Sequence, residues 1–141
     1  MSHYRQQREV RRIPPKQVFC LRPFADAQGC TTLMLRNARA DRAATLRFEV
    51  APLPCVSLWK STAAAEDGYV TGIEPGTGFP NTRRIERQRG RVPCLGPGRS
   101  RTFAIAYAVL RGHAEVARAA REIEGIQDGR KTQVDSRPEA R

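Results

Sequence analysis

Short apolar runs in which every second residue is polar constrain the fold of this chain more than any other feature. The clearest run lies in residues 43–50, where Leu46, Phe48 and Val50 alternate with polar side chains. A period of two places these three residues on one face, as in a half-buried strand. Other runs that we interpret as strands span residues 16–23, 30–37, 55–60, 68–74 and 101–110, and a short one is expected at 92–95.

The period of the pattern changes after residue 111. Val116, Ala119 and Ile123 recur at intervals of three and four, which predicts a helix over residues 112–126. Many short strands and one closing helix indicate a mainly β protein, an antiparallel β-sandwich with one C-terminal helix. In the run before the helix, aromatic and branched residues alternate with alanines, so we expect both of its faces to be covered. Residues 82–92 are charged and are expected to form no element.

The two ends of the chain are polar and differ from its middle. Residues 1–15 are rich in arginine, and residues 127–141 contain almost nothing apolar. Both are predicted to be disordered tails. The 141 residues fit a single domain, which we place at residues 16–126.

The chain is strongly basic, with a formal net charge of +11 carried mostly by arginine. Such a charge attracts polyanions, so a basic nucleic-acid-binding module is one alternative function. The arginines are spread over most of the chain, and no recognition motif accompanies them, so we favour solvated charges and do not expect a nucleic-acid partner. The sequence has neither an apolar leader at its start nor a stretch of membrane-spanning length. We therefore expect a cytoplasmic protein without a membrane partner.

The cysteines and histidines do not form the close pairs that announce a metal site. Each cysteine lies in or beside an apolar run, so we expect buried, reduced thiols, no metal and no cofactor. The residues concerned are Cys20, Cys30, Cys55, Cys94, His3 and His113.

The stretch from residue 68 to residue 81, G-Y-V-T-G-I-E-P-G-T-G-F-P-N, carries the candidate chemistry. It places Glu74 at the end of a strand, before a loop of glycines and prolines. A carboxylate held there can take a proton from a sugar hydroxyl. The pattern alone favours the simpler interpretation, in which Glu74 is an exposed turn residue.

This stretch resembles the aldose 1-epimerase (galactose mutarotase-like) superfamily, in particular a bacterial branch of aldose 1-epimerase family proteins. The resemblance runs from about residue 18 to residue 126. Its motifs are L-W-K at 58–60, G-Y-V-T-G-I-E-P-G-T at 68–77, F-P-N at 79–81, Arg83, G-R-V at 90–92 and L-G-P-G-R-S at 95–100.

The resemblance implies a β-supersandwich that binds a monosaccharide in a cleft on one sheet. In mutarotases a glutamate removes the proton of the anomeric hydroxyl and a histidine protonates the ring oxygen. Glu74 matches that glutamate. The resemblance further suggests that Trp59 stacks on a sugar, although a core position suits it equally, and that Lys60, Asn81 and Arg83 bind hydroxyls.

This chain departs from the family in ways that bear on catalysis. It resembles only the C-terminal part of the longer family domains, and neither His3 nor His113 is placed like the acid histidine. Gly78 and the doublet Arg83-Arg84 also differ from the commoner pattern. We therefore expect a sugar-binding, epimerase-like protein whose isomerase activity is impaired by a factor on the order of 100. The alternatives are completion by self-association or a complementing N-terminal half, and a truncated fragment without function.

Overall fold

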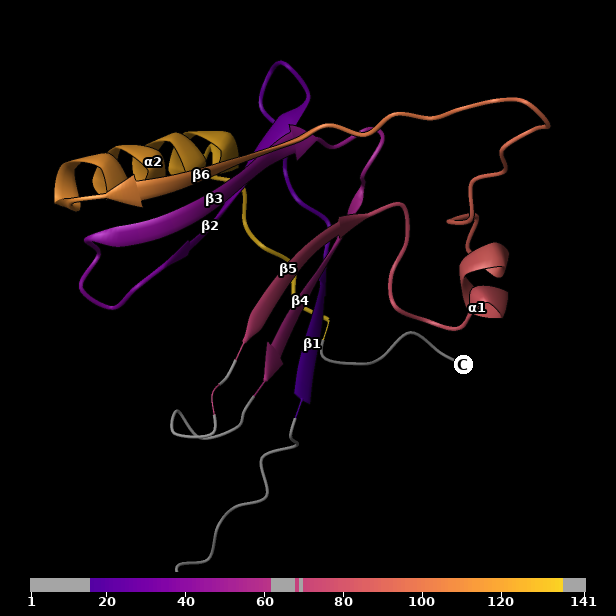
Figure 1. Cartoon of the computed structure of the whole chain (residues 1–141), viewed down its shortest axis with the longest axis horizontal. Coiled ribbons are helices and arrows are strands. Elements are labelled where there is room, and N and C mark those ends of the chain that lie inside the picture. Colours follow the sequence, from indigo (N-terminus) through magenta and orange to yellow (C-terminus); the bar gives the residue numbers. More distant parts are fainter. Residues whose placement is uncertain (1–15, 62–67, 69, 136–141) are drawn as a thin grey trace, which may run out of the picture.

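The computed structural model describes residues 16–61, 68 and 70–135, and it folds them into two three-stranded antiparallel sheets and two helices (Figure 1). Sheet A has the strand order β1-β4-β5, and sheet B has the order β2-β3-β6. In chain order the elements are β1 (Lys16–Leu21), β2 (Cys30–Arg36), β3 (Arg42–Glu49), β4 (Cys55–Ser61), β5 (Thr71–Gly76), α1 (Arg83–Gln88), β6 (Ile105–Arg111) and α2 (His113–Gln127).

The hydrophobic core lies where the two sheets meet. Phe48 of sheet B packs against Leu53 and against Val56 of sheet A, and each of the three is at most 5 % exposed. Partly buried Leu33, Ile73 and Ile105 surround them. The predicted antiparallel sandwich is thus confirmed, because apolar residues of both sheets face one shared interior.

Helix α2 covers the other face of sheet B, where it packs on β2, β3 and β6 (Figure 1). Val116 is the residue of α2 that is completely buried. The chain reverses from β6 into α2 at Gly112, whose φ of 91° lies in a region that side chains disfavour. The predicted C-terminal helix is therefore confirmed, and the floor beneath it consists largely of small residues such as Ala106 and Ala108.

A long connection, residues 77–103, projects from the end of sheet A between β5 and β6 (Figure 1), and we call it the arm. It contains α1, so the expectation that residues 82–92 form no element is wrong. The strand expected at 92–95 is absent, since these residues have no regular structure. Ile85 is the one buried apolar residue of α1. A single apolar residue cannot form a repeating pattern, so the sequence did not indicate this helix.

Two other expectations about burial are also wrong. Strand β6 leaves Tyr107 and Val109 each 73 % exposed, because nothing among the described residues covers that half of the inner face of sheet B. Of the four cysteines only Cys55 is buried, while Cys20 and Cys94 are exposed. The apolar runs that contain them end at the surface.

The predicted tail at residues 1–15 lies outside the described residues, as does the part of the C-terminal tail after residue 135. In the described part of that tail, the Arg130 guanidinium lies 4.3 Å from the ring centre of Phe24 and donates to the carbonyl of Ala25. Neither helix of the part that the structure describes combines the length and the apolar character that a membrane span requires.

Candidate functional site

The outward-facing side of sheet A carries the candidate acid, and strand register decides which residues accompany it. Glu74 of β5 lies opposite Ser57 of β4, and Gly72 lies opposite Trp59. Since residues two apart share a face, Glu74, Ser57 and Trp59 stand together on one side of the sheet. On the other flank of β4, Cys20 of β1 lies opposite Ser57. We call this set the Glu74 face.

Glu74 lies within β5 rather than after it, and its side chain is exposed. The carboxylate folds back along its own strand: a Cβ added at Gly72 would lie 2.9 Å from Glu74 Oε1. Any residue larger than glycine would therefore displace it. Because Gly72 pairs with Trp59, the carboxylate is directed toward the row of the sheet that contains the indole.

The other groups of this face are partly enclosed. Trp59 is half-buried and Ser57 is buried. Lys60 projects from the opposite side of the sheet, where its Nζ lies 5.5 Å from the ring centre of Phe19. The structure thus brings Trp59 and Glu74 together and separates Lys60 from them.

Asn81 and Arg83 belong to the arm, where Glu86 organises the chain. The buried Glu86 carboxylate accepts hydrogen bonds from the Phe79 amide at 2.9 Å and from Asn81 Nδ2 at 2.8 Å. Arg91 donates to it twice, through Nε at 2.7 Å and Nη2 at 2.6 Å. Asn81 is therefore engaged in holding the arm, while Arg83 is exposed at the first position of α1.

These donors stabilise the ionised form of Glu86. They lower its pKa from 4.5 to about 2, with the Arg91 hydrogen bonds as the largest cause and burial opposing them. The ion pair leaves the Glu86 and Arg91 side chains only 7 % and 9 % exposed. This carboxylate serves as a fixed anion within the arm, because a group ionised at such low pH is a poor proton acceptor at neutral pH.

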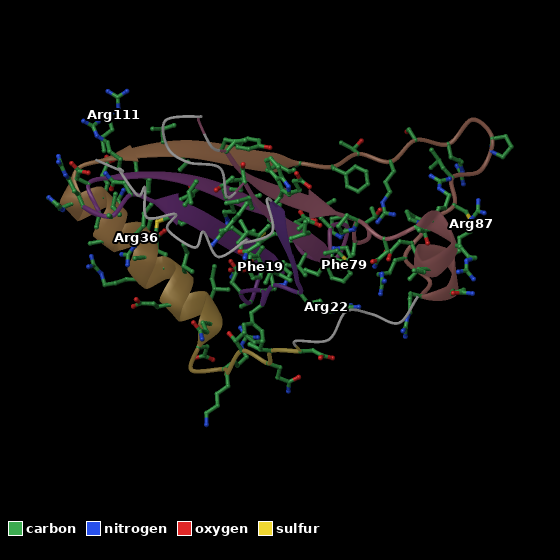
Figure 2. All side chains as sticks on the ribbon, turned by 90° about the horizontal axis from the view of Figure 1, so that it is seen from below. Phe19, Arg22, Arg36, Phe79, Arg87 and Arg111 are labelled. Atoms are coloured by element: carbon green, nitrogen blue, oxygen red, sulfur yellow. The ribbon has the colours of Figure 1, made fainter. Side chains whose placement is uncertain are left out.

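Arg22 is a residue of this region that the sequence patterns did not single out. It follows the last residue of β1, and its guanidinium lies 5.6 Å from the ring centre of Phe79, with Arg91 at 5.1 Å from the same ring (Figure 2). Burial raises the pKa of the Cys55 thiol, and the charges of Arg22 and Arg91 oppose that shift. The signal in the sequence is the alternation of β1, which places Arg22 on the same face as Cys20.

Among the described residues, no histidine lies beside Glu74 to act as a second acid–base group. His113 is the first residue of α2, which packs on sheet B, and His3 lies outside the described residues. Within residues 16–61, 68 and 70–135 there is also no group of three His, Cys, Asp or Glu side chains that could hold a metal ion.

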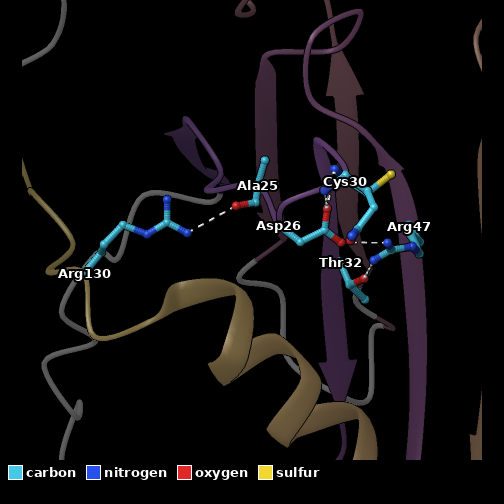
Figure 3. Close-up of polar contacts among 7 residues, drawn as sticks. Ala25, Asp26, Cys30, Thr32, Arg47 and Arg130 are labelled. Carbon is cyan, nitrogen blue, oxygen red and sulfur yellow. Dashed lines mark hydrogen bonds and ion pairs between the residues drawn. The ribbon is translucent and has the colours of Figure 1, made fainter.

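A hollow of about 970 Å³ lies away from the Glu74 face, between α2 and the outer side of sheet B. Alanines line its floor, and at one end Arg47 pairs with Asp26 at 2.7 Å and donates to Thr32 (Figure 3). The Arg47 hydrogen bond is the main cause that lowers the pKa of Asp26. None of the site residues predicted from the sequence lines this hollow, which results from packing a helix on small side chains.

Comparisons with known proteins connect this arrangement to one family. A family described as "Domain of unknown function (DUF4432)" matches residues 2–109. The crystal structure of a "putative aldose 1-epimerase" from Klebsiella pneumoniae superimposes with a TM-score of 0.85 at 37 % sequence identity. The match covers 90 % of this chain and 33 % of that chain, so the chain spans about a third of that protein's length. Curated proteins gave no match.

Proposed function

This chain belongs to the DUF4432 family, and from that premise we propose that it binds a monosaccharide on the Glu74 face of sheet A. The likeness to the Klebsiella pneumoniae protein described as an aldose 1-epimerase supports a carbohydrate-related role. The observation that carries the proposal is the pairing of Trp59 with Gly72, over which the Glu74 carboxylate lies. An indole beside a carboxylate offers an apolar surface for the sugar ring and an acceptor for its hydroxyls.

In this proposal Glu74 is the general base if the protein catalyses epimerisation. A carboxylate beside an anomeric hydroxyl can accept its proton, which opens the route to ring opening and inversion of the anomer. His113 lies on α2 and so does not supply an acid beside Glu74. We therefore assign sugar binding to Trp59 and Glu74, and we expect mutarotation by this chain alone to be slow. Polarimetry on α-glucose should give a rate close to that of buffer.

Trp59 provides a direct measurement, since it is the single tryptophan of the chain. Titration with glucose, galactose and other aldoses is expected to change the tryptophan emission, and saturation-transfer NMR should show contact with the sugar ring. Glu74→Gln should weaken binding about tenfold, because it replaces a hydrogen bond to a charged group by a neutral one. Glu49→Gln, an exposed glutamate of sheet B, is the matched control and should bind as the unchanged chain does.

The result that contradicts the proposal is a folded chain whose Trp59 emission and NMR spectrum respond to no aldose. Equal affinity in Glu74→Gln and in the unchanged chain would leave sugar binding intact but remove Glu74 from it.

A further inference from the structure

The arm carries a large share of the positive charge of this protein. Residues 77–103 contain seven arginines and one acidic residue, Glu86, so this segment carries +6 of the chain's net charge of +11. Arg91 and Glu86 neutralise each other in a buried ion pair. The remaining arginines of the arm are exposed, namely Arg83, Arg84, Arg87, Arg89, Arg99 and Arg101. Slightly more than half of the net charge of the molecule therefore lies on the segment that directly follows β5.

Arg22 lies outside the arm, after β1, and adds a further positive charge on the Glu74 face itself. Its guanidinium rests on Phe79 at the root of the arm, and no carboxylate of the described residues pairs with it. The register places Arg22 beside Cys55 and Gly76, one row of the sheet beyond Glu74, so Arg22 and Glu74 start about 12 Å apart, with Cys55 and Ser57 of β4 between them. Both side chains are long and exposed, so a molecule the size of a substituted hexose can contact both.

The electrostatics of this arrangement favour an anion. A neutral sugar would need only the carboxylate and the indole, and it would leave Arg22 unused. The negative charge of Glu74 repels an acidic ligand, but it is outnumbered by Arg22 and the six exposed arginines of the arm. Clustered charge of one sign raises the local concentration of oppositely charged ligands and increases their rate of association.

We propose that the ligand of the Glu74 face is a monosaccharide with an acidic substituent, a carboxylate or a phosphate, which Arg22 binds by charge-assisted hydrogen bonds. This inference rests on the proposed function, because it names the class of sugar for the same face. Guanidinium groups suit both oxyanions, since their planar donors match two oxygens at once.

Titration of the full chain at low ionic strength, followed by Trp59 emission, tests the proposal with glucose, glucuronate and glucose 6-phosphate as ligands. The acidic sugars are expected to bind about tenfold more tightly than glucose, and the stronger of the two identifies carboxylate or phosphate as the recognised group. Arg22→Gln should remove the preference, and Arg22→Lys should retain part of it.

Arg36→Gln is the matched control, because Arg36 is exposed at the opposite end of the molecule from the arm (Figure 2). It removes the same charge and should keep the preference. If glucose binds as tightly as the acidic sugars, or if both glutamine variants lose the same affinity, the inference is overturned and the proposed function stands. If no sugar binds, the proposed function itself fails. If a duplex DNA binds with a steep salt dependence while acidic sugars show no advantage, the arm serves nucleic acid and the inference is wrong.

Discussion

Glu86 is a buried carboxylate that accepts hydrogen bonds from three residues of the arm. The Phe79 amide, the Asn81 side chain and the Arg91 guanidinium all donate to its two oxygens. A buried charge is tolerated only when it is paired and hydrogen-bonded, and these four hydrogen bonds all come from residues of the arm. Glu86 therefore stabilises a segment in which α1 contributes one buried apolar residue, Ile85.

We expect the stability of the protein to fall as the pH drops from about 4.5 toward about 2. The pKa of Glu86 is about 2 in the folded protein and 4.5 without its partners, so the unfolded chain binds the proton more readily in this window. Glu86→Gln should lower the free energy of unfolding at pH 7 by about 2 kcal/mol. Urea unfolding at pH 7 and pH 3 measures both effects, and the difference between variant and parent should shrink at pH 3.

The control is Glu122→Gln, whose partner Arg118 lies 4.0 Å away with both side chains about two-thirds exposed. This surface pair should contribute little at either pH. A Glu86→Gln deficit of the same size at pH 3 as at pH 7 would show that the charge of Glu86 is not what stabilises the arm.

At the scale of elements, strands with strict alternation were predictable and elements held by tertiary contacts were not. The bounds of the expected strand at 43–50 and of the observed β3 (Arg42–Glu49) agree closely, although the strand is not half-buried, since Ala43 and Thr45 on its other face are also buried. Strand β5 extends through Pro75. A proline is acceptable there because β5 is an edge strand, and a residue whose amide would face the open edge of the sheet needs no amide donor. Helix α1 depends on Glu86 and on polar donors five to seven residues away, which a periodic pattern of apolar residues does not reveal.

The docking of α2 depends on one completely buried valine. Val116→Ala should lower the free energy of unfolding by about 2 kcal/mol, because the methyl groups it removes leave a cavity against sheet B. Val109→Ala makes the same chemical change at a β6 position that is 73 % exposed, and it should cost much less. Equal losses in chemical denaturation would mean that α2 does not depend on Val116.

At the scale of the whole molecule, the sheets are only partly covered. Leu35, Tyr107 and Val109 share the inner face of sheet B, and each is about half exposed or more. Sheet A likewise exposes Phe19 and Leu21. Apolar surface arranged in this way favours association, so the expected self-association or complementing half stays a prediction.

Sedimentation velocity over a range of concentrations tests that prediction. We expect species heavier than the 15.8 kDa chain at high concentration, and Val109→Lys should shift the distribution toward the monomer. Arg36→Lys, a substitution at the same end of the molecule that keeps the charge, should leave it unchanged. A monomer at every concentration would show that the exposed face has no partner in a second copy.

The residues of the candidate site were predictable from the sequence only in part. Glu74 and Trp59 stood out through the motifs around them, and the structure brings them together on one face. Lys60 follows Trp59 directly and so projects from the other side of the sheet, as any neighbour in a strand must. Arg22 is far from both in sequence, and only the pairing of β1 with β4 reveals it.

The strand order has a consequence for how the chain reaches its native state. Strands β2 and β3 are neighbours in sequence and can pair as a hairpin soon after synthesis. Strand β6 must join β3 across β4, β5 and the whole arm, which is a contact of long sequence separation. Such closures are slow, so on the ribosome the edge of β3 stays open to wrong partners until residues 105–111 emerge.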